Sequence, residues 1–145
     1  MFLGTYEHTL DAKGRLVMPV KFRSKLAGGC VVTPGQEGCL TVWPLEAFQQ
    51  EYDRIANLPA TDRSARMYRR TIFACGADVV LDGQGRIPIP EHLREWSGMV
   101  KDVTVTGSGP LIEVWARGAW EAERDEAGEF FNNIESPLGL DGTSI

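Results

Sequence analysis

The sequence contains no long hydrophobic run. None of its apolar stretches approaches the roughly 20 residues that a membrane-spanning helix needs. The first fifteen residues, MFLGTYEHTLDAKGR, lack a positive flank followed by an apolar segment, which is the pattern of a secretory signal peptide. We therefore expect a cytoplasmic protein without a membrane partner.

Cysteine and histidine are both scarce. Cys30, Cys39 and Cys75 show no C-x-x-C spacing, and His8 and His92 are far apart. A metal site needs clustered ligands, so we expect no metal and interpret the cysteines as small buried thiols in a reducing compartment. The chain also lacks a Ser/His/Asp set and a phosphate-binding loop. It is not expected to be an enzyme, to hold a cofactor or to act on a small-molecule substrate.

An overall excess of positive charge is absent as well, since the formal net charge is -5. The distribution is uneven. Residues 1–72 contain ten Lys or Arg and seven Asp or Glu, a net charge of +3, whereas residues 73–145 contain five and thirteen, a net charge of -8. Seven of these acids and one base follow residue 120, so residues 1–120 carry a net charge of +1. A net charge this close to zero, with local basic patches, does not exclude binding to a polyanion.

The chain does contain an internal repeat. DAKGRLVMP at residues 11–19 is matched 71 residues later by DGQGRIPIP at residues 82–90. Phe22-Arg23 matches Leu93-Arg94 at the same offset. At an offset of 72, VVTPG matches VTVTG, LTVW matches IEVW, and Ala47-Phe48 matches Ala119-Trp120. Agreement at this many ordered positions predicts two structural repeats that cover most of the chain.

Each repeat predicts four short strands and one tight turn. The strands are expected at residues 6–10, 15–18, 30–33 and 39–43, and again at residues 77–81, 86–89, 103–106 and 111–115. The first two strands of each repeat flank the D-x-x-G turn and are expected to form a two-stranded ribbon. Gly14 and Gly85 can adopt the positive φ angle that a tight turn needs. Asp11 and Asp82 can accept hydrogen bonds from the turn's own amides, so we interpret these four residues as turn-forming.

Helical patterns fill the remainder. Apolar spacing predicts a helix over residues 45–56, a second capped by Thr61 or Asp62 and ending near Phe73, and a third containing Trp120 and Phe131. Pro19 and Pro90 can each open a short helix at its first position. Trp43 and Trp115, at matching strand ends, are interpreted as packing residues.

The predicted organisation follows from these patterns. It comprises a first repeat (1–58), a connecting helix (59–75), a second repeat with a C-terminal helix (76–131) and a flexible tail (132–145). Because neither repeat can bury its apolar face alone, we expect both to share one core. The expected fold class is α+β, mainly β, with a pseudo-two-fold β-barrel and flanking helices.

The doubled D-x-x-G-R-x-x-x-P motif, each copy followed by two strands and a helix, resembles the MraZ family. MFLGTYEHTLDAKGRLVMPVKFR is especially similar to it, and the resemblance covers roughly residues 1–135. It implies two AbrB-like swapped-hairpin repeats. It also implies a bacterial, nucleoid-associated transcriptional regulator that binds repeated double-stranded DNA boxes upstream of the division and cell-wall gene cluster. The resemblance further implies a ring-shaped homo-oligomer that represses its own operon.

The resemblance implies that the motif arginines, Arg15 and Arg86, contact DNA. Lys13 matches the basic position of the first motif, and Gln84 replaces it in the second, so the two surfaces are expected to differ. A two-stranded ribbon fits the major groove, where a guanidinium can meet guanine O6 and N7. Lys13 is suited to phosphate, and Gln84 to an adenine edge or a phosphate.

Other interpretations stay open. Arg15 and Arg86 could simply pair with the aspartates of their own turns. Lys21 and Arg23, with Lys25, could line a phosphate-facing surface or form an ordinary solvated one.

Arg63, Arg66 and Arg70, with Arg69, share a helix face that could meet DNA. We favour ion pairs within the chain or with an acidic neighbour in an oligomer. An alternative function is an oligomeric protein-interaction module without specific DNA binding, with the acidic tail as a docking segment.

Overall fold

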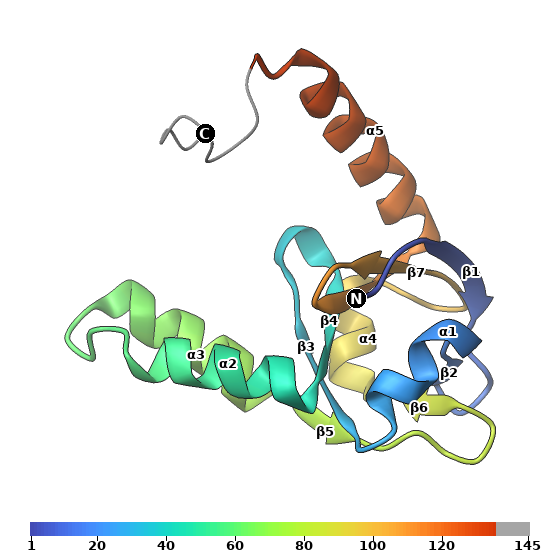
Figure 1. Cartoon of the computed structure of the whole chain (residues 1–145), viewed down its shortest axis with the longest axis horizontal. Helices are drawn as coiled ribbons and strands as arrows, with labels where there is room; N and C mark the ends of the chain where they lie inside the picture. Colours follow the sequence, from blue (N-terminus) through green and yellow to red (C-terminus); the bar gives the residue numbers. More distant parts are fainter. Residues whose placement is uncertain (136–145) are drawn as a thin grey trace.

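A computed structural model describes residues 1–135, and within them eight β-strands and five α-helices follow one another along the chain (Figure 1). The strands are β1 (Thr5–Thr9), β2 (Arg15–Val17), β3 (Cys30–Pro34), β4 (Leu40–Pro44), β5 (Ala77–Val79), β6 (Arg86–Pro88), β7 (Asp102–Ser108) and β8 (Leu111–Ala116). The helices are α1 (Val20–Arg23), α2 (Leu45–Ala56), α3 (Arg63–Cys75), α4 (Glu91–Ser97) and α5 (Arg117–Asn133), with single 3₁₀ turns at η1 (Ser24–Leu26) and η2 (Gln36–Gly38).

The predicted elements are confirmed with small shifts at their ends. All eight strands and the three longer helices are present. Pro19 and Pro90 precede α1 and α4 at the N-cap position, one residue before the first helical position predicted for them, and make no capping hydrogen bond. More residues lie in helices than in strands, so the description "mainly β" is wrong. The predicted tail lies outside the described residues from residue 136 onward.

The two repeats exchange strands. The large antiparallel sheet has the order β1-β7-β8-β4-β3-β5. Each repeat contributes one hairpin, β3–β4 or β7–β8, and the hairpins meet at β4–β8. The other repeat supplies each edge: β1 pairs with β7, and β5 pairs with β3. Each repeat therefore completes the sheet of the other, and the pairing is symmetric under their exchange.

Strands β2 and β6 form a separate two-stranded ribbon, with Leu16 opposite Ile87. The ribbon predicted within each repeat is therefore wrong. Among the described residues, β1 and β2 share only the single bridge between Leu10 and Leu16, because β2 pairs with the equivalent strand of the other repeat. The expected closure into a barrel is not observed either, since β1 and β5 are the two edges of an open sheet.

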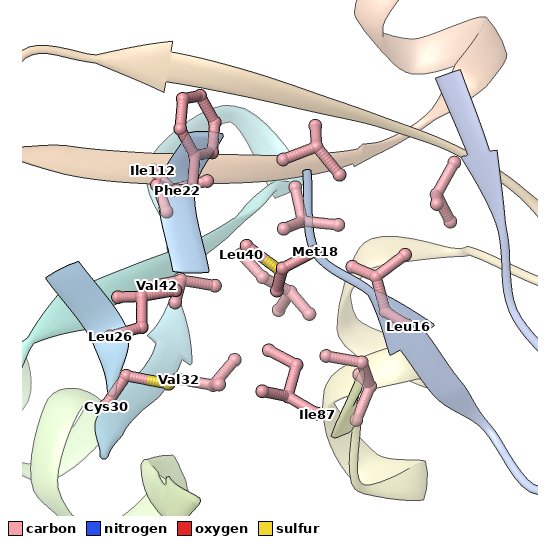
Figure 2. Close-up of a cluster of buried hydrophobic side chains, with 14 of the residues drawn as sticks. Leu16, Met18, Phe22, Leu26, Cys30, Val32, Leu40, Val42, Ile87 and Ile112 are labelled. Carbon is pink, nitrogen blue, oxygen red and sulfur yellow. The ribbon is translucent and has the colours of Figure 1, made fainter. Parts of the chain in front are cut away.

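One hydrophobic core unites both repeats. Figure 2 shows side chains from the ribbon, the sheet and α1 in a single cluster that includes Leu16, Met18, Phe22, Val32, Leu40, Val42, Ile87 and Ile112. Successive strand residues point to opposite sides, so Leu16 and Ile87 at the centre of the ribbon both face this core and are fully buried.

Helices α2 and α3 form a hairpin that extends away from the sheet (Figure 1). Asp62 caps α3, as predicted, by accepting a hydrogen bond from the Ser64 amide at 3.1 Å. The carboxylate of Glu51 on α2, which is almost buried, pairs with Arg54 and accepts a 3.0 Å hydrogen bond from the Tyr68 hydroxyl on α3. These polar contacts join the two helices beyond the edge of the main core.

Helix α5 leaves the sheet in a different direction, and no residue along it is buried (Figure 1). At its base, the rings of Trp115 and Trp120 lie 5.7 Å apart, and Trp43 and Phe48 make the equivalent contact at 5.8 Å in the first repeat. The predicted packing role of both strand-end tryptophans is confirmed.

The three cysteines are free thiols, two of them buried and Cys75 half-buried. Burial raises the pKa of Cys30 to about 11, and burial with nearby carboxylates raises the pKa of Cys39 to about 12. Their interpretation as small buried thiols is confirmed for Cys30 and Cys39. No helix of residues 1–135 has the length and apolar character of a membrane span.

Shortening Leu16 should destabilise both repeats at once. We expect Leu16→Ala to lower the free energy of unfolding by about 2–5 kcal/mol, because it leaves a cavity where the ribbon meets the core. Urea denaturation followed by circular dichroism measures this change. Val100→Ala removes a side chain that is 89% exposed and should have little effect. Equal midpoints for Leu16→Ala and wild type would contradict the shared core.

Candidate nucleic-acid interface

The two D-x-x-G-R turns have the same internal structure. Asp11 Oδ1 accepts hydrogen bonds from the amides of Lys13 and Arg15, both at 2.9 Å. Asp82 Oδ1 accepts the equivalent bonds from Gln84 and Arg86, also at 2.9 Å. Both turns thus satisfy their own backbone donors and hold Lys13 and Gln84 exposed at their tips.

Each motif arginine is held by the aspartate of its own turn. Arg15 Nε donates to Asp11 Oδ2 at 2.7 Å, and Arg86 Nε donates to Asp82 Oδ2 at 2.7 Å. The ion pairs that the alternative interpretation anticipated are therefore present. They use only Nε, and Nη1 and Nη2 of Arg15 make no hydrogen bond to residues 1–135. The outer edge of this guanidinium stays available to a ligand.

The β2–β6 ribbon brings the two motifs together. Val17 pairs with Arg86 in its register, and Arg15 pairs with Pro88. Arg86 Nη1 lies 3.8 Å from Asp11 Oδ2, a contact between the repeats. Arginines 71 residues apart in the sequence thus share one ribbon.

A second pair of arginines crosses between the repeats. Arg23 covers Gly85 in the opposite turn, and Arg94 covers Gly14, so closely that a Cβ atom at either glycine would collide with the guanidinium. Both glycines also have positive φ angles, 74° and 75°. The positive φ angle is what favours glycine at both positions, and the missing side chain leaves room for the guanidinium. Arg23 Nε also donates to the Met18 carbonyl at 2.9 Å.

The predicted basic surface is divided by these contacts. Lys21 is exposed, Arg23 packs on the opposite turn, and Lys25 turns to the N-terminus, where Nζ donates to the Met1 carbonyl at 2.9 Å. Sequence analysis did not select Arg94. The signal was present, because Arg94 is the repeat match of Arg23.

The electrostatics of the turns favour permanent ionisation of their carboxylates. Hydrogen bonds from the Arg15 amide and guanidinium and the Lys13 amide lower the pKa of Asp11 to about 2. The equivalent bonds from Arg86 and Gln84 lower the pKa of Asp82. Around these two carboxylates gather five cationic residues, Lys13, Arg15, Arg23, Arg86 and Arg94. The surface is therefore basic although the whole chain is acidic.

The remaining sequence candidates lie elsewhere. The four arginines at positions 63, 66, 69 and 70 are on α3, which extends away from the ribbon (Figure 1). Burial, with the nearby charge of Arg23, lowers the pKa of His8. Within residues 1–135, no group of three or more His, Cys, Asp or Glu side chains could hold a metal ion.

Comparison with known proteins places this chain in a family. A family model described as "MraZ protein, putative antitoxin-like" matches residues 1–71 and again residues 72–138. This chain belongs to the MraZ family. Three relatives that carry the name "Transcriptional regulator MraZ" are 47% identical over 135 residues (Salinispora tropica), 42% over 138 residues (Frankia casuarinae) and 49% over 142 residues (Nocardioides sp.). These alignments cover 93%, 95% and 97% of this chain and 95%, 96% and 99% of the relatives.

Two glycines of the second turn, one covered by Arg23 and one in open space, allow a matched comparison of alanine substitutions. Gly85→Ala should lower the free energy of unfolding by at least about 1–2 kcal/mol, because Ala is strained at positive φ and its methyl group displaces Arg23. Gly83→Ala, in the same turn, has open space around the new Cβ and no positive φ, and should stay within about 0.5 kcal/mol of wild type. Thermal or urea unfolding compares the two. Equal effects would contradict the need for glycine at position 85.

The lowered pKa of Asp11 predicts a pH dependence at acid pH. Because the folded-state pKa of about 2 lies below the ordinary 3.8, its stabilisation is fully present above pH 4 and is lost as the pH falls toward 2. Urea unfolding between pH 5 and pH 2 should give a smaller pH slope for Asp11→Asn than for wild type. Identical slopes would show that the turn does not stabilise the carboxylate.

Proposed function

We propose that this chain is a sequence-specific DNA-binding transcriptional regulator that reads DNA with its β2–β6 ribbon. The observation that carries this proposal is the convergence of Arg15 and Arg86, both half-buried, on the side of one ribbon that faces away from the core, each held by Nε. A two-stranded ribbon is one of the elements that the major groove admits. The names of the relatives, all transcriptional regulators, support the same function.

The held arginines suit base recognition. A guanidinium can donate two parallel hydrogen bonds to guanine O6 and N7, and only a defined orientation gives selectivity. Asp11 fixes the orientation of Arg15 through Nε and the Arg15 amide, so less side-chain freedom is lost when DNA binds. Asp82 does the same for Arg86. In this function the ion pairs therefore orient the arginines for DNA.

The two halves of the ribbon would make different contacts with DNA. Lys13 at the tip of the first turn supplies a phosphate contact. Gln84 at the second tip supplies a neutral amide for an adenine edge or a phosphate. Lys21, exposed on α1, could add a further phosphate contact, and Arg23 and Arg94 contribute charge at the turns. A symmetric ribbon with unlike tips favours a DNA box that is not palindromic.

One subunit offers few phosphate contacts, so weak and salt-sensitive binding is expected of it alone. Several subunits of a homo-oligomeric ring, bound to several repeated promoter boxes, would recover affinity through effective concentration. We therefore extend the proposal to a ring that acts in the nucleoid, upstream of the division and cell-wall gene cluster, and represses its own operon. The alternative is an oligomeric module that binds a protein partner without specific DNA binding.

Substitution of the ribbon arginines tests the proposal. With the chain's own upstream region as probe, Arg15→Ala and Arg86→Ala should each weaken specific binding by about 1–3 kcal/mol, which is about 5- to 160-fold. Arg15→Lys should lose a similar amount while the salt dependence changes little, because charge is kept and the fork is lost. Mobility shifts at two salt concentrations, with a scrambled competitor, measure both effects.

Sizing of each variant belongs to the same experiment. Lys101→Ala removes an exposed cation from the loop before β7 and should bind DNA as wild type does. If correctly assembled wild type shows no preference for its upstream region, the DNA proposal fails and the protein-interaction alternative is favoured.

A further inference from the structure

Helices α3 and α5 carry opposite charge. Over residues 63–75, α3 has four arginines and no acid, a net charge of +4. Over residues 117–133, α5 has five acids and two arginines, a net charge of -3. Figure 1 shows the two helices leaving the sheet in different directions, and no ion pair joins them in the described chain. Within residues 1–135, each charged surface therefore lacks its complement in its own subunit.

The outward face of α3 forms a defined stripe. Arg63, Met67, Arg70 and Ala74 follow one another at spacings of four, three and four residues, and all are exposed. Arg63 and Arg70 make no side-chain hydrogen bond or ion pair to residues 1–135, and Met67 is 47% exposed. Tyr68, on another face of the helix, contacts α2. We call these four residues the α3 stripe.

The internal repeat shows that α5 is the uncovered counterpart of α2. The two helices follow matching strands, β4 and β8, at an offset of 72 residues. Helix α2 is covered by α3, and its Ile55 is only 1% exposed. The matching residue on α5, Ala127, is exposed, and no helix follows α5 in the described residues.

The distal part of α5 is both acidic and apolar. Glu126, Glu129 and Phe130 line a shallow hollow there with Asn133 and Ile134. The ring of Phe130 is 45% exposed and that of Phe131 is 74% exposed. We call Glu126, Glu129 and Phe130 the α5 stripe. It pairs carboxylates with an apolar ring, as the α3 stripe pairs guanidinium groups with a methionine.

We propose that the α5 stripe of one subunit docks on the α3 stripe of a second copy of this chain. Glu126 and Glu129 then face Arg63 and Arg70, and Phe130 packs against Met67. Such an interface joins two different surfaces, and a joined pair still has a free α3 stripe on one subunit and a free α5 stripe on the other. It therefore propagates head to tail and forms a ring where the rotation closes. This inference rests on the proposed homo-oligomer and names the surfaces that join its subunits.

A second copy of this chain, unlike DNA, accounts for the apolar and acidic side chains of these surfaces as well as for the arginines. DNA would neutralise the α3 arginines but would leave Phe130 and Phe131 in water, and phosphate repels the acids of α5. A groove of about 710 Å³ beside α3 adds apolar surface from Met67, Trp96 and Leu111, along with the carboxylate of Glu113. The aromatic rings at the end of α5 match the apolar part of this groove. This match favours a protein over a nucleic acid as the partner.

Reciprocal charge reversal tests the interface. Arg63→Glu/Arg70→Glu reverses the α3 stripe, and Glu126→Arg/Glu129→Arg reverses the α5 stripe. Each variant alone should assemble at least about tenfold more weakly than wild type in sedimentation velocity, because like charges then meet. An equimolar mixture of the two should reassemble by alternating subunits, and the chain with all four changes should assemble by itself. Lys101→Glu is the control and should assemble as wild type.

Each outcome is decisive. Loss in each variant with recovery in the mixture supports the inference, and neutral Arg63→Gln/Arg70→Gln, with weaker and less salt-sensitive assembly, supports it even if a reversed chain fails to fold. Unchanged assembly of both variants, no recovery in the mixture, or a monomeric wild type overturns it. So does an α3 variant that assembles normally but loses affinity for duplex DNA. Specific DNA binding by wild type is scored separately, so its failure sinks the proposed function without deciding the interface.

Discussion

Backbone pairing between the repeats is the constraint on which the structure depends. The strand pairs β1–β7, β5–β3, β4–β8 and β2–β6 each join one repeat to the other. The ribbon cannot form until both motifs are present, and its formation is what places Arg15 and Arg86 on one surface. The same pairing carries Arg23 and Arg94 over the opposite glycines. Folding and assembly of the candidate site are therefore one event.

The turn sequence D-x-x-G-R satisfies several requirements within five residues. The aspartate accepts bonds from the turn amides and from the arginine, the glycine adopts a positive φ angle beneath a guanidinium, and the arginine begins the ribbon. Side chains used for recognition usually lose conformational freedom on binding. Here Asp11 and Asp82 have restricted that freedom already, and their lowered pKa keeps them ionised at neutral pH. For Arg15, the ion pair is compatible with the proposed DNA contact because the pair uses Nε and leaves Nη1 and Nη2 without a hydrogen bond to residues 1–135.

Local patterns predicted most elements from the sequence. Strand and helix positions, the Asp62 cap and the packing of Trp43 and Trp115 depend on neighbouring residues, which periodicity and the repeat reveal. The pairing of β2 with β6 was missed because a strand pattern does not name its partner, and the nearest strand in sequence is not the one used. The open sheet was missed for the same reason. Arg94 was overlooked although its match to Arg23 was visible, because repeat symmetry was used for the fold and not for the site.

The differences between the two repeats explain why the two ends of the subunit are not alike. Two equal halves would give a subunit with identical ends. Among residues 1–135, a helix follows only the first half, so α2 is covered by α3 and α5 is not, and the two ends of this part of the subunit differ in shape and charge. Gln84 in place of Lys13 likewise makes the two turn tips unequal. The symmetric exchange of strands forms the ribbon. The unequal helices make the two ends of the subunit different, and so give it a direction. The proposed alignment of several ribbons along one DNA would need both, because the ribbon would set each contact and the direction of the subunits would set the spacing of the contacts.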